Sequence, residues 1–398
     1  MRILFLSDNY PPEVNAPALR THAHCREWVA AGAEVTVISC VPNFPQGVPH
    51  KGYENRWVQE ETVDGVRVVR VWSYMAANAG FAARIVDYVS FAVASVIAGL
   101  AQDFDVIVAT SPQFFTAWAG SVLATIKRRP WVFEVRDLWP ASIVATGAMR
   151  NGFAIRLLER LELDLYRSAD LIVPVTSAFE RNLIARGIPG DGICVVPNGV
   201  NTEEWNSKGG VADRSNSEPF KVGYLGTMGL AHGLEVLLEA ASLLAEEDVQ
   251  FEITGDGAAR DWLISFAEVR ELTNVTFHDP IGREQVPDRL QAFHAAVIPL
   301  RATKTFTEVI PSKIFETAAA GVPILLGVRG EAQRLVERYR AGIAFEPENP
   351  QELAAAIRRL KLDPSLSRRL AEGGAELARD FDRRVLARTM LERIKALV

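Results

Sequence analysis

The chain has 398 residues, of which 48% are hydrophobic and 23% are charged, and its formal net charge is −6. A globular chain of this length normally divides into two domains, and its acidic balance gives no reason to expect nucleic acid as a partner. Three cysteines, Cys25, Cys40 and Cys194, lie far apart without metal or redox spacing, which fits a reducing compartment such as the cytoplasm.

The first half of the chain alternates short apolar runs with segments of helical period. We expect strands that are covered on both faces at residues 2–8, 34–41, 105–111, 131–137 and 171–176. Helices are expected near residues 17–31, 80–101, 113–128, 151–168 and 177–187. Asp64-Gly65, between alternating residues in 62–72, predicts an inserted hairpin. The opening MRILFLSDNYPPE predicts a first strand and not a signal peptide.

A second series of the same kind follows residues 206–219, which are rich in Ser, Gly and Asn and predict a linker. Its expected strands are residues 220–227, 249–255, 274–278, 294–300, 323–328 and 343–346, and the tail from about 350 is helical. Such alternation forms parallel sheets that bind ligands at the carboxyl ends of their strands. We therefore expect two Rossmann-like, doubly wound α/β domains facing each other across a cleft. They cover 1–205 and 220–380, and a C-terminal helix at about 381–398 packs back on the first.

The segment 297–327 (VIPLRATKTFTEVIPSKIFETAAAGVPILLG) carries the strongest chemical signal. A buried strand ends at Leu300, a polar loop follows, and a helix begins around Pro311-Ser312, where proline is favoured. A helix N-terminus at the carboxyl end of a strand presents free N–H groups and a positive dipole end to an anion. This position therefore predicts an anion site.

Charged side chains surround the predicted anion site. Arg301, Lys304 and Lys313 supply positive charge. Glu308 lies in the loop, from which it could reach a sugar, and Glu316 lies inside the helix, where it could accept hydrogen bonds from ribose hydroxyls. Cations, N–H groups and two carboxylates together suit a nucleotide-diphosphate-sugar. The alternative is a capped surface helix with solvated charges, which the tight helix end at 318–321 disfavours.

The spacing of Glu308 and Glu316 resembles the E-x7-E donor-binding signature of glycosyltransferase family 4, and PSKIFE resembles its WbuB-like bacterial branch. The similarity covers nearly the whole chain. It includes LSDNYPPEVNAPALRT near the N-terminus, FEVRDLWPASIVATG (133–147), VVPNGVN (195–201), YLGTMGLAHGLEVLLEAA (224–241) and GDG (255–257). The family implies a GT-B fold, transfer with retention of anomeric configuration, and neither metal nor other cofactor. It also implies that Glu308 meets the donor sugar and Glu316 the ribose.

The resemblance extends the expected donor site beyond the two glutamates. The set is Val309, Ile310, Pro311, Ser312, Lys304 and Lys313, together with Gly226, Thr227, His232, Gly255 and Gly257. Many family members have Arg and Lys where this chain has Thr227 and His232, so Arg301 and Lys313 are expected to hold more of the pyrophosphate.

The first loop of the chain also departs from the family. Many members have paired glycines where this chain has Asn15 and Ala16, which makes the loop bulkier and brings its backbone less close to a ligand. His22 near this loop could touch a phosphate, and the alternative is a partly buried surface histidine.

Asp137 is the candidate catalytic carboxylate of the first domain. It follows the expected strand 131–137, where it could orient an acceptor hydroxyl or cap the next segment, and both interpretations stay open. Retention by double displacement requires a carboxylate nucleophile beside the anomeric carbon. The resemblance favours front-face attack instead, in which the leaving diphosphate helps to deprotonate the acceptor. The two D-x-D matches, at 103–105 and 380–382, are expected to be helix caps and not metal sites.

These features predict a metal-independent hexosyltransferase that moves a sugar from a UDP donor to a lipid-linked saccharide in bacterial surface polysaccharide, such as O-antigen, biosynthesis. The resemblance implies that the sugar is an N-acetylated deoxyhexose and that the lipid is a polyprenyl diphosphate. Two alternatives stay open: a GT-B-fold epimerase of a UDP-sugar, which needs no acceptor, and a nucleotide-sugar sensor without turnover.

A long apolar stretch suggests contact with a membrane. Phe81–Ala101 is interrupted by charge near one end, so we expect a helix that docks and does not span. With Phe114, Phe115 and Trp118, and with the basic run at 127–129, it could form a face for an anionic bilayer. The alternative is ordinary helix packing against the sheet. The expected location is the cytoplasm, with peripheral attachment to the inner face of the cell membrane.

Overall fold

The chain forms two compact units. The computed structural model describes all residues except 45, 76–80, 112–113, 139–151 and 207–218, and the side chains of 81–82, 153–154 and 304–305 are also outside the description. The first unit comprises Met1–Pro197 and Arg383–Val398, and the second comprises Asn198–Asp382. Most of the predicted linker and the last part of the string 133–147 therefore lie outside the described residues.

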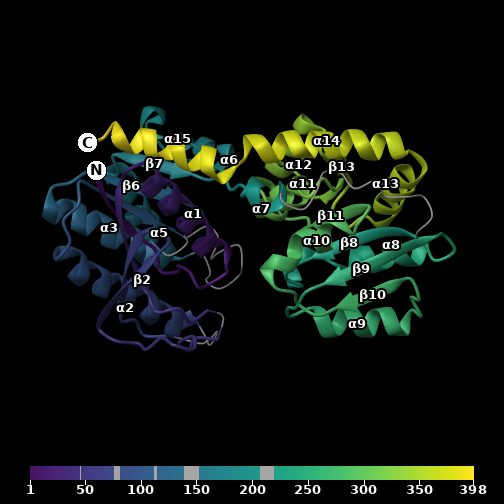
Figure 1. Cartoon of the computed structure of the whole chain (residues 1–398), viewed down its shortest axis with the longest axis horizontal. Coiled ribbons are helices and arrows are strands. Elements are labelled where there is room, and N and C mark those ends of the chain that lie inside the picture. Colours follow the sequence, from purple (N-terminus) through teal and green to yellow (C-terminus); the bar gives the residue numbers. More distant parts are fainter. Residues whose placement is uncertain (45, 76–80, 112–113, 139–151, 207–218) are drawn as a thin grey trace. The chain divides into compact units, whose positions relative to one another are not determined.

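The first unit is built on a seven-stranded sheet (Figure 1). Its strands are β1 (Arg2–Leu6), β2 (Glu34–Cys40), β3 (Val58–Val63), β4 (Val66–Val71), β5 (Val106–Thr110), β6 (Trp131–Val135) and β7 (Leu171–Pro174). Their order is β3-β4-β2-β1-β5-β6-β7, and every neighbouring pair is parallel except the β3–β4 hairpin. The described helices of this unit are α1 (Ala16–Ala30), α2 (Phe81–Leu100), α3 (Phe114–Lys127), α5 (Phe153–Ser168), α6 (Ser177–Ala185) and α15 (Arg383–Lys395).

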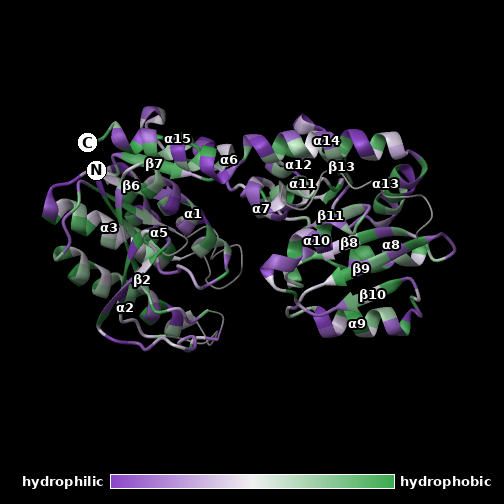
Figure 2. Ribbon diagram, viewed as in Figure 1, coloured by the Kyte–Doolittle hydropathy of each residue, from purple (hydrophilic) through white to green (hydrophobic). Residues whose placement is uncertain are grey.

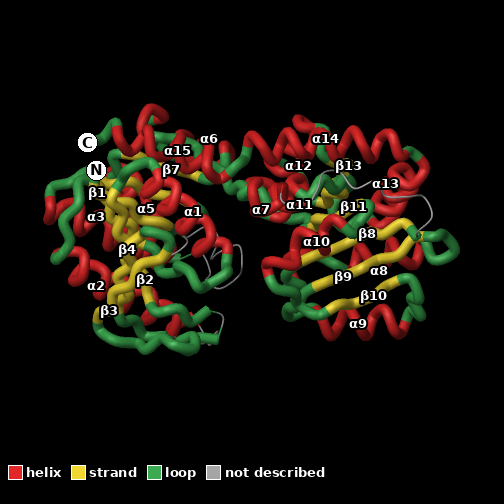
Figure 3. Tube along the Cα trace, in the orientation of Figure 1, coloured by secondary structure: helices red, strands yellow, loops and turns green. Residues whose placement is uncertain are grey.

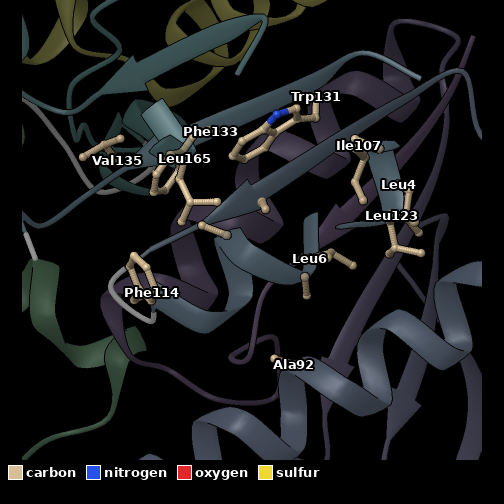
Figure 4. Close-up of a cluster of buried hydrophobic side chains, with 14 of the residues drawn as sticks. Leu4, Leu6, Ala92, Ile107, Phe114, Leu123, Trp131, Phe133, Val135 and Leu165 are labelled. Carbon is tan, nitrogen blue, oxygen red and sulfur yellow. The ribbon is translucent and has the colours of Figure 1, made fainter. Parts of the chain in front are cut away.

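Alternate side chains of each central strand pack into two different hydrophobic cores, one on each face of the sheet. Leu4 and Leu6 of β1 pack with α2 and α3 on one face, whereas Ile3 and Phe5 pack with α1 on the other. Figure 4 shows the first of these clusters, in which strand residues such as Ile107 meet helix residues such as Leu123. Both faces of the sheet are therefore buried, which is why its strands read as continuous apolar runs.

The C-terminal helix α15 belongs to the first unit. Its residues Ala387, Met390, Leu391 and Ile394 are buried in the cluster that contains Trp28 of α1. The indole Nε1 of Trp28 also donates a hydrogen bond of 2.8 Å to the carbonyl of Ala387. The last residues of the chain thus complete the core on the α1 face of the sheet.

The second unit contains a six-stranded parallel sheet with helices on both faces (Figure 3). Its strands are β8 (Phe220–Leu225), β9 (Val249–Thr254), β10 (Val275–His278), β11 (Ala295–Pro299), β12 (Ile324–Gly327) and β13 (Gly342–Ala344), in the order β10-β9-β8-β11-β12-β13. Its helices are α7 (Thr202–Asn206), α8 (Glu235–Leu243), α9 (Arg260–Val269), α10 (Val286–Gln291), α11 (Lys313–Ala319), α12 (Glu331–Tyr339), α13 (Pro350–Leu362) and α14 (Pro364–Asp380). In Figure 2 the central strands β8 and β9 are largely green, that is, hydrophobic.

The boundary between the units differs from the expected one. Residues 198–205 were expected in the first domain, but they belong to the second unit. The reason is a set of contacts with the end of α14: the amide of Val200 donates to the carbonyl of Phe381, and the Thr202 hydroxyl bonds to Asp382. Trp205 is also buried in a core cluster of the second unit. These long-range contacts leave no local signal in the sequence.

The first D-x-D match has a different role from the expected cap. Asp105 accepts hydrogen bonds from the backbone amide of Arg2 at 2.8 Å and from its Nη2 at 2.9 Å. The carboxylate therefore joins the start of β5 to the start of β1. Asp382 of the second match bonds to Thr202 in the second unit.

Candidate functional site

Loops at the carboxyl ends of β8 and β9 lie against each other in the second unit. Gly226, Gly255 and Gly257 all have φ between +128° and +153°, a region that favours glycine. A Cβ atom on Gly255 would lie 2.0 Å from the carbonyl oxygen of Gly226, and one on Gly257 would lie 2.6 Å from that of Met228. Only glycine permits this close approach. The three expected glycines therefore let the two loops form one compact surface at the carboxyl ends of β8 and β9, which we call the floor of the candidate site.

Lys313 reaches this floor from the first residue of α11. Its Nζ donates a 2.6 Å hydrogen bond to the Tyr224 hydroxyl and lies 4.0 Å from the centroid of the same ring. Tyr224 in turn donates to the carbonyl of Thr227. A Cβ atom on Gly226 would lie 2.9 Å from the ammonium nitrogen, so glycine also makes room for the lysine.

The ammonium of Lys313 has no ion-pair partner among the described residues. Burial lowers the pKa of Lys313 to about 7, and the nearby Glu316 opposes that shift only in part. A cation that is largely removed from water in this way is costly unless a counter-ion neutralises it. The position is therefore prepared for an anion, such as a phosphate, that would restore the full charge.

Thr227 and His232 do not replace the missing family cations. The Thr227 side chain is exposed, and burial together with the charge of Lys313 lowers the pKa of His232 to about 4. His232 is therefore neutral at neutral pH. Its ring packs edge-on against Tyr224, with 6.3 Å between the ring centroids. The histidine shapes the wall beside the lysine and adds no charge.

Arg301 is held by neighbours of its own. Its Nε donates to the carbonyl of Leu230 at 2.7 Å, and its two Nη atoms pair with Glu235 and Glu348. Its amide also donates to the carbonyl of Ala231. Two carboxylates thus offset the guanidinium, which favours a role in positioning the 229–233 loop over direct contact with phosphate. Sequence reasoning missed these two acidic partners, because both lie far from Arg301 in the chain.

The two glutamates occupy different surroundings. Glu308 ends a short 3-10 turn, η4 (Lys304–Glu308), and no hydrogen bond or ion pair reaches its carboxylate from the residues that the structure describes. Glu316 lies in α11, and its Oε1 is 3.7 Å from Nη1 of Arg283, which also bonds to Glu204. Arg283 lies in a turn after β10, and sequence reasoning missed it because nothing near it in the chain marks a site.

The rest of the expected donor loop is partly buried. Val309, Ile310, Pro311 and Ser312 connect η4 to α11. Ser312 stands at the N-cap, but its side chain makes no capping hydrogen bond. The Lys304 side chain lies outside the described part of the chain. A Cβ atom on Gly330, before α12, would lie 2.0 Å from the carbonyl of Thr307, so a close backbone contact holds η4 in place.

The expected residues of the first unit are not all brought together. Asn15 caps α1 by accepting a 3.0 Å hydrogen bond from the Ala18 amide, and Ala16 is the first residue of that helix. His22 was expected near this loop, and its Nε2 lies 2.9 Å from Asp64, in the turn that precedes β4. The His22 ring also packs edge-on against Tyr10 of the first loop, with 5.7 Å between the ring centroids, so it lies near this loop as well. The amide of Asp137 bonds to Ser111 at the carboxyl edge.

Neither unit shows a metal-binding cluster within its described residues. No group of three or more His, Cys, Asp and Glu side chains there is arranged to hold a metal ion.

Helices α2, α3 and α5 present an apolar surface on the first unit. Val86, Val93 and Ile97 of α2 are about half exposed, at 52%, 47% and 60%, and Trp118 of α3 is 43% exposed. A hollow of about 430 Å³ lies among these helices. Among the described helices, α2 is long and apolar enough over Ala83–Leu100 to cross a membrane, and 33% of that stretch is buried in the protein.

Comparisons with known proteins agree with this architecture. Residues 15–199 match the model of the glycosyl transferase 4-like domain, and residues 211–377 match that of the glycosyl transferases group 1. WcaI of Escherichia coli K12, named as a colanic acid biosynthesis glycosyl transferase, is 25% identical over 92% of this chain and 93% of its own length. A glycogen synthase of Mycobacterium tuberculosis is also 25% identical, over 97% of this chain and 92% of its own length.

Solved structures share the fold. Sucrose-phosphate synthase from Thermosynechococcus elongatus superposes with a TM-score of 0.79 at 19% identity and covers 100% of this chain and 98% of its own. HepE of Anabaena, in complex with UDP and glucose, gives a TM-score of 0.71 at 17% identity and covers both chains fully. At these identities the likeness concerns the fold.

The lowered pKa of Lys313 predicts how stability depends on pH. The folded protein loses this proton near pH 7 and the unfolded chain near pH 10.5, so the unfolded chain binds more protons between these values. Stability therefore rises with pH through that window, by up to about 1.4 kcal/mol per unit. Urea unfolding of Lys313→Met should lack this rise, whereas Lys395→Met, an exposed control, should keep it. An unchanged pH slope in Lys313→Met would contradict the assignment.

Proposed function

This chain is a glycosyltransferase with the GT-B fold, and we propose that it transfers a sugar from a UDP donor to a lipid-linked saccharide in bacterial surface polysaccharide biosynthesis. The names of relatives such as WcaI support the pathway class. The resemblance of PSKIFE to the WbuB-like branch supports an N-acetylated deoxyhexose as the sugar, retention of configuration, and catalysis without a metal.

One observation carries the donor assignment. The ammonium of Lys313 lies at the carboxyl end of β8, over Tyr224, without a paired carboxylate among the described residues. A diphosphate there would supply the missing counter-charge. HepE, which shares the fold, has been solved with UDP and with UDP-glucose, and this supports a nucleotide sugar as the natural source of that diphosphate.

The mechanism follows from where charge develops. As the glycosidic bond breaks, the β-phosphate gains negative charge, and Lys313 stabilises it because a buried cation interacts strongly with a nearby anion. Arg301 holds the adjacent loop and so fixes the phosphate position. Glu308 lies beside the sugar, and its carboxylate stabilises the positive charge that develops on the sugar in the transition state. The departing phosphate takes the proton of the attacking acceptor hydroxyl on the same face, which retains the configuration.

The acceptor and the membrane are proposed together. An acceptor carried on a polyprenyl diphosphate is confined to a bilayer, so an enzyme acting on it gains from lying at that surface. The exposed apolar residues of α2 and α3, and the basic run at 127–129 that ends α3, suit an anionic leaflet. We assign this surface to peripheral attachment at the cytoplasmic side.

Replacing the two glutamates should change different kinetic parameters. Glu316 is assigned to the ribose, which changes little during transfer, so Glu316→Ala should raise the donor KM more than it lowers kcat. Glu308→Gln keeps the shape but removes the charge beside the reacting sugar, so kcat should fall by roughly 10²–10³ with UDP affinity nearly unchanged.

Steady-state kinetics with a separate acceptor measure both effects, and Glu337→Gln, an exposed carboxylate of α12, is the control. Near-normal turnover in Glu308→Gln would show that another residue faces the reacting centre. Sugar conversion without acceptor would favour the epimerase, and UDP-sugar binding without turnover would favour the sensor.

The membrane assignment predicts flotation with liposomes. The protein should rise with anionic vesicles at low salt, because both apolar contact and charge attraction act there, and should rise less at high salt. Ile97→Asp should reduce flotation, whereas Val385→Asp, on an equally exposed site of α15, should not. A wild-type protein that stays at the bottom of the gradient at low salt would remove the assignment.

A further inference from the structure

Arg136 is a partly buried cation, and the residues that the structure describes give it no paired carboxylate. It follows β6 at the carboxyl edge of the first sheet, where its amide donates a 2.7 Å hydrogen bond to the Ser111 hydroxyl. Its side-chain atoms Nε and Nη1 are buried and have no hydrogen-bond partner among the described residues. Within the described residues no carboxylate forms an ion pair with its guanidinium. Native proteins rarely leave a buried charged group in this state.

Other buried arginines of the same unit are fully engaged. Arg20 bonds to Glu134 at 2.8 Å and to the carbonyls of Val196 and Pro197. Arg70 bonds to Glu61 and to two backbone carbonyls. The contrast shows that the fold can satisfy a buried guanidinium with its own groups, whereas at Arg136 the described part of the chain does not.

The charges around Arg136 leave a net positive balance. Burial would raise the pKa of Glu134, but Arg20, His24 and Arg136 hold it at about 2, so this carboxylate is ionised. Burial, with the charge of Arg20, lowers the pKa of His24 to about 3, which keeps it neutral. Two arginines therefore share one carboxylate. Asp8 is the other nearby acid, and burial raises its pKa to about 7, so it is only a partial counter-ion.

Arg136 is partly exposed and lies at the carboxyl edge of the first sheet. Glu134 of β6 contacts Arg20 of α1, so these two residues lie at the same height along the sheet. From Glu134 to Arg136 the chain advances two residues, or about 6.6 Å, toward the carboxyl edge. From Arg20 back to Ala16, α1 covers about 6 Å in the same direction. Arg136 is thus level with the first turn of α1, whose positive dipole end adds to its charge. The carboxyl edge of a parallel α/β sheet is where such folds bind ligands.

We propose that Arg136 binds an anionic group of the acceptor, a phosphate or a carboxylate, at the carboxyl edge of the first sheet. Guanidinium groups favour both oxyanions because their N–H groups match these acceptors in charge and geometry. The inference rests on the proposed function, in which the second unit holds the donor diphosphate through Lys313. It places the anionic part of the acceptor on the first unit, with Arg136 as its anchor.

Calorimetry on UDP-saturated protein tests the site, since UDP then fills the donor position. Inorganic phosphate, inorganic diphosphate and glucuronate are the probes, and the phosphates and the carboxylate distinguish the two kinds of acceptor anion. The wild type should bind at least one of them. Arg136→Gln should weaken that binding at least about tenfold, and Arg136→Lys should lose less. Arg186→Gln, which removes an arginine paired with Glu162, should leave it unchanged.

Thermal melting without ligand separates a binding role from a structural one. Arg136→Gln removes an unpaired buried charge and should melt at the wild-type temperature or above it, as is common where a site sacrifices stability for function. Arg20→Gln breaks a paired charge and should melt lower. A fall in Arg136→Gln as large as that in Arg20→Gln would contradict the proposal.

Three binding results would also overturn it: no probe binds the wild type, Arg136→Gln binds as well as the wild type, or a probe binds the free protein and UDP added afterwards displaces it. Displacement by UDP would mean that Arg136 belongs to the donor site. UDP affinity itself should be equal in the wild type and Arg136→Gln. If the protein fails to bind UDP but binds a probe through Arg136, the donor assignment is contradicted. The anion site at Arg136 is then still supported.

Discussion

The hydrogen bond between the Lys313 ammonium and the Tyr224 hydroxyl is the contact on which the candidate donor site depends. It joins the start of α11 to the end of β8, and it holds a cation where the described residues provide no paired carboxylate. Gly226 makes room for the lysine, while Gly255 and Gly257 let the next loop approach. The cost of this unpaired charge is what an anionic ligand would relieve.

The surrounding groups fix that lysine in place. Arg301, offset by Glu235 and Glu348, secures the loop that carries His232, and His232 packs against Tyr224 as a neutral ring. In the proposed donor site, a cation from α11 takes the place of the family cations that this chain lacks. A lysine at the start of α11 reaches the same floor as one that would come from the loop after β8.

The sequence predicted the architecture better than the site. Continuous apolar runs located the strands well, for example 34–41 against the observed Glu34–Cys40, because sheets covered on both faces leave a strong pattern. The placement of Lys313 on Tyr224 joins residues 89 positions apart, which no local pattern reports. For the same reason, the pairing of Arg283 with Glu316 and the lack of a paired carboxylate for Arg136 among the described residues became visible only in three dimensions. Motif resemblance indicated several of the residues that meet around Lys313 in the second unit, such as Gly226 and His232, and the three-dimensional surroundings determine which of them are charged.

The central claim is that Lys313 binds the donor diphosphate without a metal, and the proton balance of UDP binding tests it most directly. At about pH 8 the free lysine is largely neutral, because its pKa is about 7, and a bound diphosphate should draw a proton onto it. Titration calorimetry in EDTA, repeated in buffers of different ionisation heat, should therefore show uptake of up to about one proton by the wild type and much less by Lys313→Met. Equal proton uptake by both proteins, or UDP binding only after manganese is added, would contradict the account.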